Sequence, residues 1–144
     1  MMTKSWTNHW VCDPAFSELK PLPIFHKEHD KTFNRPPHEK CLENVHTLFR
    51  QKLELTSTDI VGNAIFLDIS ADDYYKLYIN GKFVGEGPAQ SYPFAYPYNC
   101  FDVTDLLQSG ENAIGIHLFY QGLFNIYLMS ADNLCGMICQ LEIL

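Results

Sequence analysis

Two stretches decide the fold: ADDYYKLYINGKFVGEGP at residues 71–88 and YNCFDVTDLLQSGENAIGIH at residues 98–117. In the first, alternating apolar runs on either side meet at Asn80-Gly81. This dipeptide predicts a two-residue β-hairpin, because both central positions of a type I′ turn need a positive φ. In the second stretch a short capped turn leads into another strand at Gly110-Glu111-Asn112.

Alternation of polar and apolar residues continues outside these stretches. It predicts further strands at residues 49–55, 65–70, 114–120, 124–129 and 135–144, separated by turns rich in Gly, Asn and Asp. Short antiparallel strands at this spacing indicate an all-β fold, a sandwich of the jelly-roll type.

The first third of the chain has a different character. Residues 6–12, which include Trp6 and Trp10, predict a short edge strand, and half of the chain's eight prolines lie between Pro21 and Pro37. We therefore expect an edge strand and an irregular arm over residues 1–47 and the sandwich over residues 48–144. The last residues form an alternating strand without a polar tail, which favours an N-terminal portion of a longer protein.

Composition excludes several classes of function. A length of 144 residues suits one domain, and 47% hydrophobic residues suit a packed core. The net charge of −7 argues against nucleic acid and against an anionic membrane surface. No apolar run approaches the roughly 20 residues of a membrane span. Five cysteines without framework spacing, and an N-terminus unlike a signal peptide, predict a cytoplasmic protein. A secreted protein that has lost its leader is the alternative.

Paired carboxylates are the first candidates for chemistry, because glycoside hydrolysis uses two of them about 5–10 Å apart. Asp72 and Asp73 lie in a turn, where Asp bonds its own backbone, and Asp102 and Thr104 lie where a helical turn begins. We expect structural roles for these and predict no catalytic residue. The remaining candidates are Asp68, Glu86, Asp105 and Glu111.

Metal and cofactor sites are not predicted. One group, His26, His29, His38 and Cys41, has spacing that a tetrahedral zinc could use, but it lies in a proline-broken, charged stretch that favours solvated side chains. Cys135 and Cys139 share one strand face about 13 Å apart, too far for a disulfide. His117 is a single polar residue in an alternating strand. No phosphate-binding or dinucleotide motif is present.

An aromatic loop at residues 92–98 is the one candidate binding site. Its rings are Tyr92, Phe94, Tyr96 and Tyr98. Aromatic rings stack on the C–H faces of sugars, and tyrosine adds a hydroxyl. The same rings could instead cover the sandwich core or contact a neighbouring domain. These three interpretations stay open.

The motifs at residues 75–85 and 102–115 closely resemble the N-terminal β-sandwich of bacterial α-L-rhamnosidases of glycoside hydrolase family 78. They also resemble the sugar-binding domains of β-galactosidase-type hydrolases. The resemblance extends from about Leu48 to Gly122, and Trp10-Val11 is similar to the Trp-Ile pair that opens the family's first strand. It implies a galactose-binding-like sandwich with an irregular N-terminal arm. The calcium of some family modules has no ligand set that matches here.

The resemblance also implies a function. In α-L-rhamnosidases the catalytic acids lie in a helical barrel that has no counterpart in these residues. We therefore expect a non-catalytic accessory domain that supports substrate binding or packs on a catalytic domain. Its expected partners are the other domains of one polypeptide and a saccharide. The alternatives are an independent carbohydrate-binding module and a purely structural interaction domain.

Overall fold

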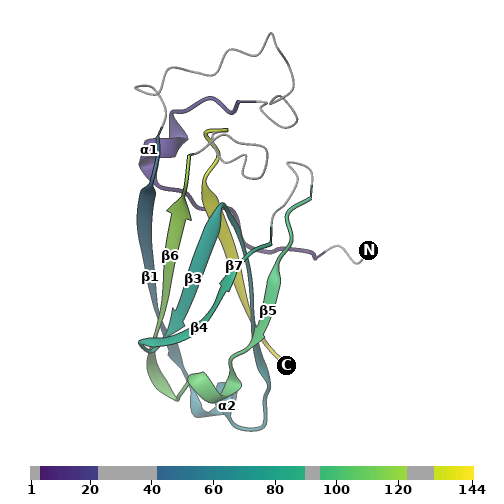
Figure 1. Cartoon of the computed structure of the whole chain (residues 1–144). Coiled ribbons are helices and arrows are strands. Elements are labelled where there is room, and N and C mark those ends of the chain that lie inside the picture. Colours follow the sequence, from purple (N-terminus) through teal and green to yellow (C-terminus); the bar gives the residue numbers. More distant parts are fainter. Residues whose placement is uncertain (1–3, 23–41, 90–94, 123–131) are drawn as a thin grey trace.

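The computed structural model describes residues 4–22, 42–89, 95–122 and 132–144. Its strands form two antiparallel sheets (Figure 1). The four-stranded sheet has the order β1-β6-β3-β4, and the three-stranded sheet has the order β5-β2-β7. The strands are β1 (Val45–Leu55), β2 (Ile65–Asp72), β3 (Tyr74–Ile79), β4 (Lys82–Gly87), β5 (Asn99–Asp102), β6 (Gly110–Tyr120) and β7 (Gly136–Ile143). The predicted all-β sandwich of antiparallel sheets is confirmed.

The helices are single turns. They are α1 (Pro14–Ser17), α2 (Ser57–Ile60) and the 3₁₀ turn η3 (Thr104–Leu106). A capping box starts α2, because the Thr56 hydroxyl accepts the Asp59 N–H and the Asp59 carboxylate accepts the Thr56 N–H. Before η3, Asp102 accepts both the backbone N–H and the hydroxyl of Thr104. Among the described residues, no helix is long and apolar enough to cross a bilayer.

The hairpin of β3 and β4 forms at Asn80-Gly81 as predicted. Asn80 has φ of 50° and Gly81 has φ of 80°, and Ile79 pairs with Lys82 across the two-residue loop. Asn80 also fixes the hairpin against β6, because its side-chain oxygen accepts the Ala113 N–H at 2.9 Å. Its amide group donates to the side chain of Asn112 at 2.9 Å. The turn therefore sets the register of two strand pairs.

The core lies between the two sheets and takes one face of each central strand. Side chains at alternate positions are fully buried, as strand geometry requires. The fully buried strand residues include Ile65, Leu67 and Ile69 of β2 and Leu77 and Ile79 of β3. Ile114 and Ile116 of β6 point inward as expected, and Phe16 of α1 closes one end against Tyr120 with ring centroids 4.9 Å apart.

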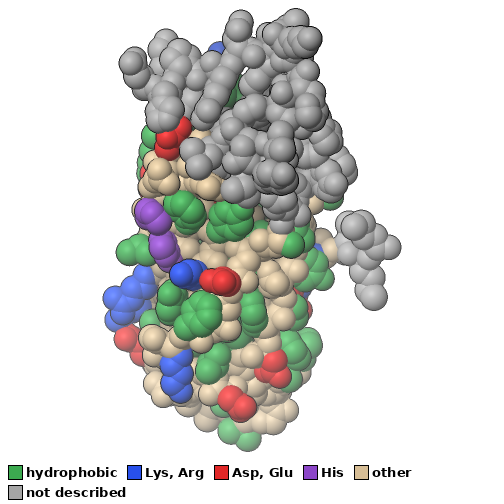
Figure 2. All heavy atoms as spheres, viewed as in Figure 1, with side chains coloured by type: hydrophobic (Ala, Val, Ile, Leu, Met, Phe, Trp, Pro, Cys, Tyr) green, Lys and Arg blue, Asp and Glu red, His purple; other side chains and the backbone are tan. Residues whose placement is uncertain are grey.

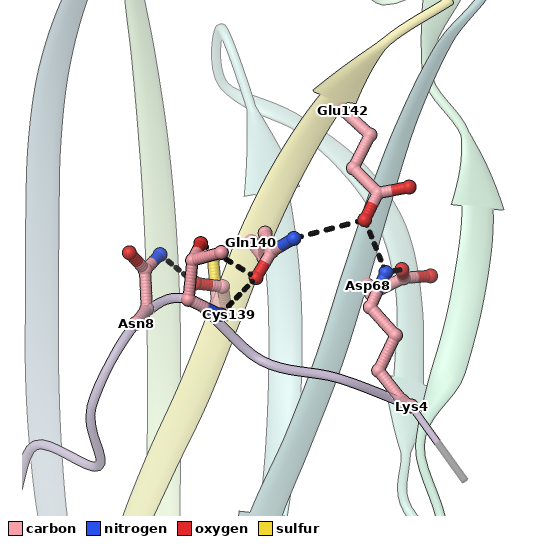
Figure 3. Close-up of polar contacts among 7 residues, drawn as sticks. Lys4, Asn8, Asp68, Cys139, Gln140 and Glu142 are labelled. Carbon is pink, nitrogen blue, oxygen red and sulfur yellow. Dashed lines mark hydrogen bonds and ion pairs between the residues drawn. The ribbon is translucent and has the colours of Figure 1, made fainter.

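The N-terminal segment crosses the outer side of the three-stranded sheet (Figure 3). Val11 pairs with Met137 of β7 through two backbone bonds of 2.9 Å. Further along, the Asn8 amide donates to the Cys139 carbonyl, and the Lys4 ammonium bonds the carboxylates of Asp68 and Glu142. In place of a predicted edge strand over residues 6–12, one isolated bridge joins this segment to β7.

Other sequence predictions fall partly outside the described residues. The strand expected at residues 124–129 and the possible zinc ligands His26, His29, His38 and Cys41 lie there. Strand β1 begins at Val45, close to the expected start of the sandwich at residue 48. Cys135 and Cys139 are free thiols.

Candidate functional site

The outer face of the four-stranded sheet carries three rings in one row, the ring row of His46, Phe119 and Tyr74. Strand register places them side by side, because His46 pairs with Phe119 and Phe119 pairs with Tyr74. The His46 and Phe119 rings stack at 4.6 Å between centroids, and Phe119 and Tyr74 follow at 6.5 Å. Cross-strand aromatic pairs of this kind stabilise a sheet face.

A pair of histidines links the ring row to a second row of residues, which consists of His117, Lys76 and Glu86. The His46 Nδ1 and His117 Nε2 atoms are 2.8 Å apart, so one imidazole donates a hydrogen bond to the other. Burial lowers the pKa of His117, and the nearby His46 and Lys76 lower it further. The His117 imidazole is therefore neutral at pH 7 and able to take part in this bond.

Lys76 and Glu86, which carry opposite charges, complete this second row. Lys76 of β3 is in register with His117 of β6 on one side and with Glu86 of β4 on the other. Both side chains are exposed. Within the described ranges, neither the Lys76 ammonium nor the Glu86 carboxylate has a hydrogen-bond or ion-pair partner. Their hydrogen-bonding capacity is therefore available to a ligand.

Between these rows and the end of β4 lies a groove of about 420 Å³, half open to solvent. We call it the sheet groove. Figure 2 shows this face, with the histidines next to a basic and an acidic side chain and hydrophobic side chains around them. The groove is lined by His46, Tyr74, Tyr75, Lys76, Glu86, Gly87, Pro88, His117 and Phe119. Small-molecule sites combine apolar walls with a few polar groups in this way.

Of the predicted aromatic-loop site, the described rings Tyr96 and Tyr98 do not line this groove. Tyr92 and Phe94 lie outside the described residues. Tyr96 packs edge-on against Trp10, with ring centroids 5.2 Å apart, and its hydroxyl donates to Asp72 at 2.9 Å. Tyr98 packs edge-on against Trp6 at 5.8 Å. The described half of the loop thus contacts the N-terminal segment, while Tyr98 keeps 40% of its surface exposed.

Three aspartates gather at the end of the sandwich near this loop. Asp72 accepts the Tyr96 hydroxyl, Asp73 accepts the Gln121 N–H at 3.0 Å, and Asp132 accepts the Leu134 N–H at 3.0 Å. Burial raises the pKa of Asp72, and neighbouring Asp73 adds to the rise. Burial, followed by the charge of Asp72, raises the pKa of Asp132 to about 7. Each carboxylate bonds neighbouring backbone or side chains, which is the structural role expected from sequence.

Three of the other candidate acids have a hydrogen-bond or ion-pair partner. Asp68 is 4% exposed and bonds Lys4, Asp102 accepts the Thr104 N–H at the start of η3, and Glu111 pairs with Lys52 at 2.8 Å. In the part of the chain that the structure describes, no group of three or more His, Cys, Asp or Glu side chains is arranged to hold a metal ion.

Sequence reasoning missed the sheet groove. His117 stood out as a polar residue in an alternating strand, but its partner His46 lies far away in the chain, and only the pairing of β1 with β6 brings them together. The signal available in the sequence was the alternation within each strand. It places Tyr74, Lys76 and His117 at positions whose side chains point away from the core.

Comparison with known proteins identifies the family. A family model described as the α-L-rhamnosidase N-terminal domain matches residues 62–142. No curated protein matches the chain. Among solved structures, a glycoside hydrolase family 78 rhamnosidase of Bacillus sp. GL1 is 29% identical, with a TM-score of 0.59 over 71% of this chain and 10% of its own. The α-L-rhamnosidase of Aspergillus terreus is 28% identical, with a TM-score of 0.60 over 76% of this chain and 13% of its own.

A third structure agrees. The α-L-rhamnosidase of Dictyoglumus thermophilum is 25% identical, with a TM-score of 0.56 over 68% of this chain and 11% of its own. The chain thus spans about a tenth of the length of these enzymes. The family match runs from the turn before β2 through most of β7, over more than half of the chain, and includes both sequence motifs that decide the fold. The chain belongs to the α-L-rhamnosidase N-terminal domain family.

Proposed function

We propose that this chain is a non-catalytic accessory domain of an α-L-rhamnosidase, a glycoside hydrolase whose catalytic residues lie in another part of the enzyme. The observation that carries the proposal is the family match over residues 62–142. The structural relatives named rhamnosidases support it, because the chain corresponds to about a tenth of each.

The arrangement of carboxylates also favours an accessory role. Asp72, Asp73 and Asp132 form one group of acids, and each accepts a hydrogen bond from the sandwich or its loops. A retaining or inverting glycosidase needs two carboxylates that face a substrate across one bond. Carboxylates that already accept hydrogen bonds from the sandwich or its loops are poorly placed to face a substrate in this way.

The partners we propose are the other domains of the same polypeptide and a saccharide. The net charge of −7 argues against nucleic acid and anionic membranes as partners. A cytoplasmic location fits the free thiols of Cys12, Cys100, Cys135 and Cys139. An independent carbohydrate-binding module is the second candidate, and the sheet groove is the observation that favours it.

A chimera tests the accessory role. In the Bacillus sp. GL1 rhamnosidase, the segment that aligns with this chain is replaced by this chain. Hydrolysis of p-nitrophenyl α-L-rhamnoside by the chimera is then compared with hydrolysis by the intact enzyme, by a version that lacks the segment and by this chain alone. We expect the chimera to recover activity that the deletion loses, and the chain alone to show none. Turnover by the chain alone, or a chimera no better than the deletion, would overturn the proposal.

A further inference from the structure

We propose that the sheet groove binds one ring of a neutral saccharide, with Lys76 and Glu86 holding adjacent hydroxyls and Tyr74 and Phe119 contacting its C–H face. The site lies on the outer face of the four-stranded sheet, and the described loop residues 95–98 are not part of its lining. The choice of a saccharide as ligand rests on the proposed function. The position of the site rests on the structure of the groove.

The shape of the groove suits a small ring. Its volume of about 420 Å³ lies within the roughly 300–1,000 Å³ of small-molecule sites. Tyr74, Phe119 and Pro88 supply apolar surface. Phe119 stacks on His46, which holds the ring row in place before any ligand binds. A preformed apolar wall reduces the entropy lost on binding.

The polar side of the groove offers both a donor and an acceptor. Sheet register places Lys76 opposite Glu86, and among the described residues neither side chain has a hydrogen-bond or ion-pair partner. An ammonium donates only and a carboxylate accepts only. Adjacent sugar hydroxyls do both, so two neighbouring hydroxyls satisfy this pair. A hydrocarbon ligand would leave both charges unsatisfied.

The charge of the groove favours an uncharged ligand. Lys76 and Glu86 cancel each other, and the lowered pKa of His117 keeps its imidazole neutral at pH 7. The chain as a whole carries −7 and repels anions at long range. A uronic acid would also place its carboxylate near Glu86. We therefore expect neutral sugars to bind in preference to their uronic acids.

The test is an NMR titration of the ¹⁵N-labelled full chain with three probes: methyl α-L-rhamnoside, methyl β-D-galactoside and D-galacturonate. We expect saturable shifts at amides 74–76, 86–87 and 117–119 with a neutral probe, and weaker binding of galacturonate. No saturable shift with either neutral sugar, or shifts confined to residues 95–98, would overturn the proposal. Tighter binding of galacturonate would overturn the preference for neutral sugars.

Matched variants separate a site from a general surface effect. Lys76→Met and Glu86→Gln each remove one charge-assisted hydrogen bond and should weaken binding about tenfold or more. Lys82→Met at the hairpin and Glu54→Gln on β1 make the same chemical changes outside the groove lining and should leave affinity unchanged. Equal affinity in all four variants would overturn the assignment. Glu86→Gln keeps the shape of the side chain, so it carries the test if Lys76→Met fails to fold.

The two proposals fail in different ways. Binding is measured on the isolated chain, and the accessory role is measured as hydrolysis by the chimera. Loss of sugar binding with a functional chimera leaves a domain that acts by packing. Sugar binding without a functional chimera leaves an independent binding module.

Discussion

Gly85 of β4 lies directly against the ring of Phe101 of β5, so close that a Cβ on Gly85 would come within 2.5 Å of the Phe101 Cε1 atom. The two strands belong to different sheets, and the missing side chain lets them approach. Gly85 thus sets how closely the two sheets pack at this edge.

Gly85→Ala should therefore destabilise the protein by about 1–3 kcal/mol, because the Phe101 ring must move out of its place in the core. Chemical denaturation measures the change. Gly115→Ala is the matched control, since its Cβ would meet only the Tyr78 Cβ at 3.8 Å. We expect that variant to be neutral or slightly stabilised, as alanine loses less backbone entropy than glycine. Equal losses in the two variants would contradict the role of Gly85.

Lys4→Met should cost about 1–3 kcal/mol of stability. It leaves the carboxylate of Asp68, which is 4% exposed, without its ammonium partner. Lys20→Met, an exposed change in the same segment, serves as control. Combining Lys4→Met with Asp68→Asn should recover part of the loss, because the unpaired buried charge is then gone. A double variant less stable than the sum of both single changes would contradict this account.

Asn112→Ala should be the most harmful of these changes, with a loss of about 2–4 kcal/mol. The side chain is 1% exposed and makes four hydrogen bonds. Its oxygen accepts from Asn80 and from the Gln108 N–H, and its amide donates to the Gln108 and Gly110 carbonyls. Truncation leaves buried partners unsatisfied.

Asn112→Asp keeps the two acceptor positions and loses both donors, so its loss should be nearly as large. Thermal unfolding of the two variants measures this comparison. A wild-type melting temperature for either variant would show that water replaces these bonds at no cost.

Stability should fall as the pH rises from 5 to 8. The folded-state pKa of Asp132 is about 7, against an ordinary value of 3.8, so the folded state binds more protons between these values. The resulting stability is present at low pH and is lost as the pH rises through 7. Burial shifts the pKa of Asp72 in the same direction.

Asp132→Asn should flatten this dependence, since an amide oxygen still accepts the Leu134 N–H without titrating. We expect the variant to gain about 1–2 kcal/mol relative to wild type at pH 8 and little at pH 5. Asp105→Asn, at an exposed position, should leave the slope unchanged. Parallel curves for wild type and Asp132→Asn would rule out Asp132 as the titrating group.

Local sequence signals predicted most of the fold. Asn80-Gly81 predicted the hairpin because few other dipeptides accept two positive φ angles, and alternation predicted the strands because one face of each strand is buried. A local structural role for Asp102 could also be predicted, since its partner Thr104 is two residues away.

Contacts between segments that are distant in the chain could not be predicted from the sequence. Tyr96 meets Trp10, and His46 meets His117, only because particular strands and segments pair, and that pairing depends on the whole sheet. The predicted sugar-binding roles of Tyr96 and Tyr98 stay predictions, as do those of Tyr92 and Phe94. The sheet groove needed cross-strand register before Lys76 and Glu86 could be recognised as neighbours.

The pairing of Val11 with Met137 has a practical consequence for producing this protein. That contact pairs the backbone of Met137 at the outer edge of β7, where unpaired backbone groups would otherwise offer a template for another chain. A shortened version that starts after Cys12 would expose this edge and should precipitate or form edge-to-edge oligomers.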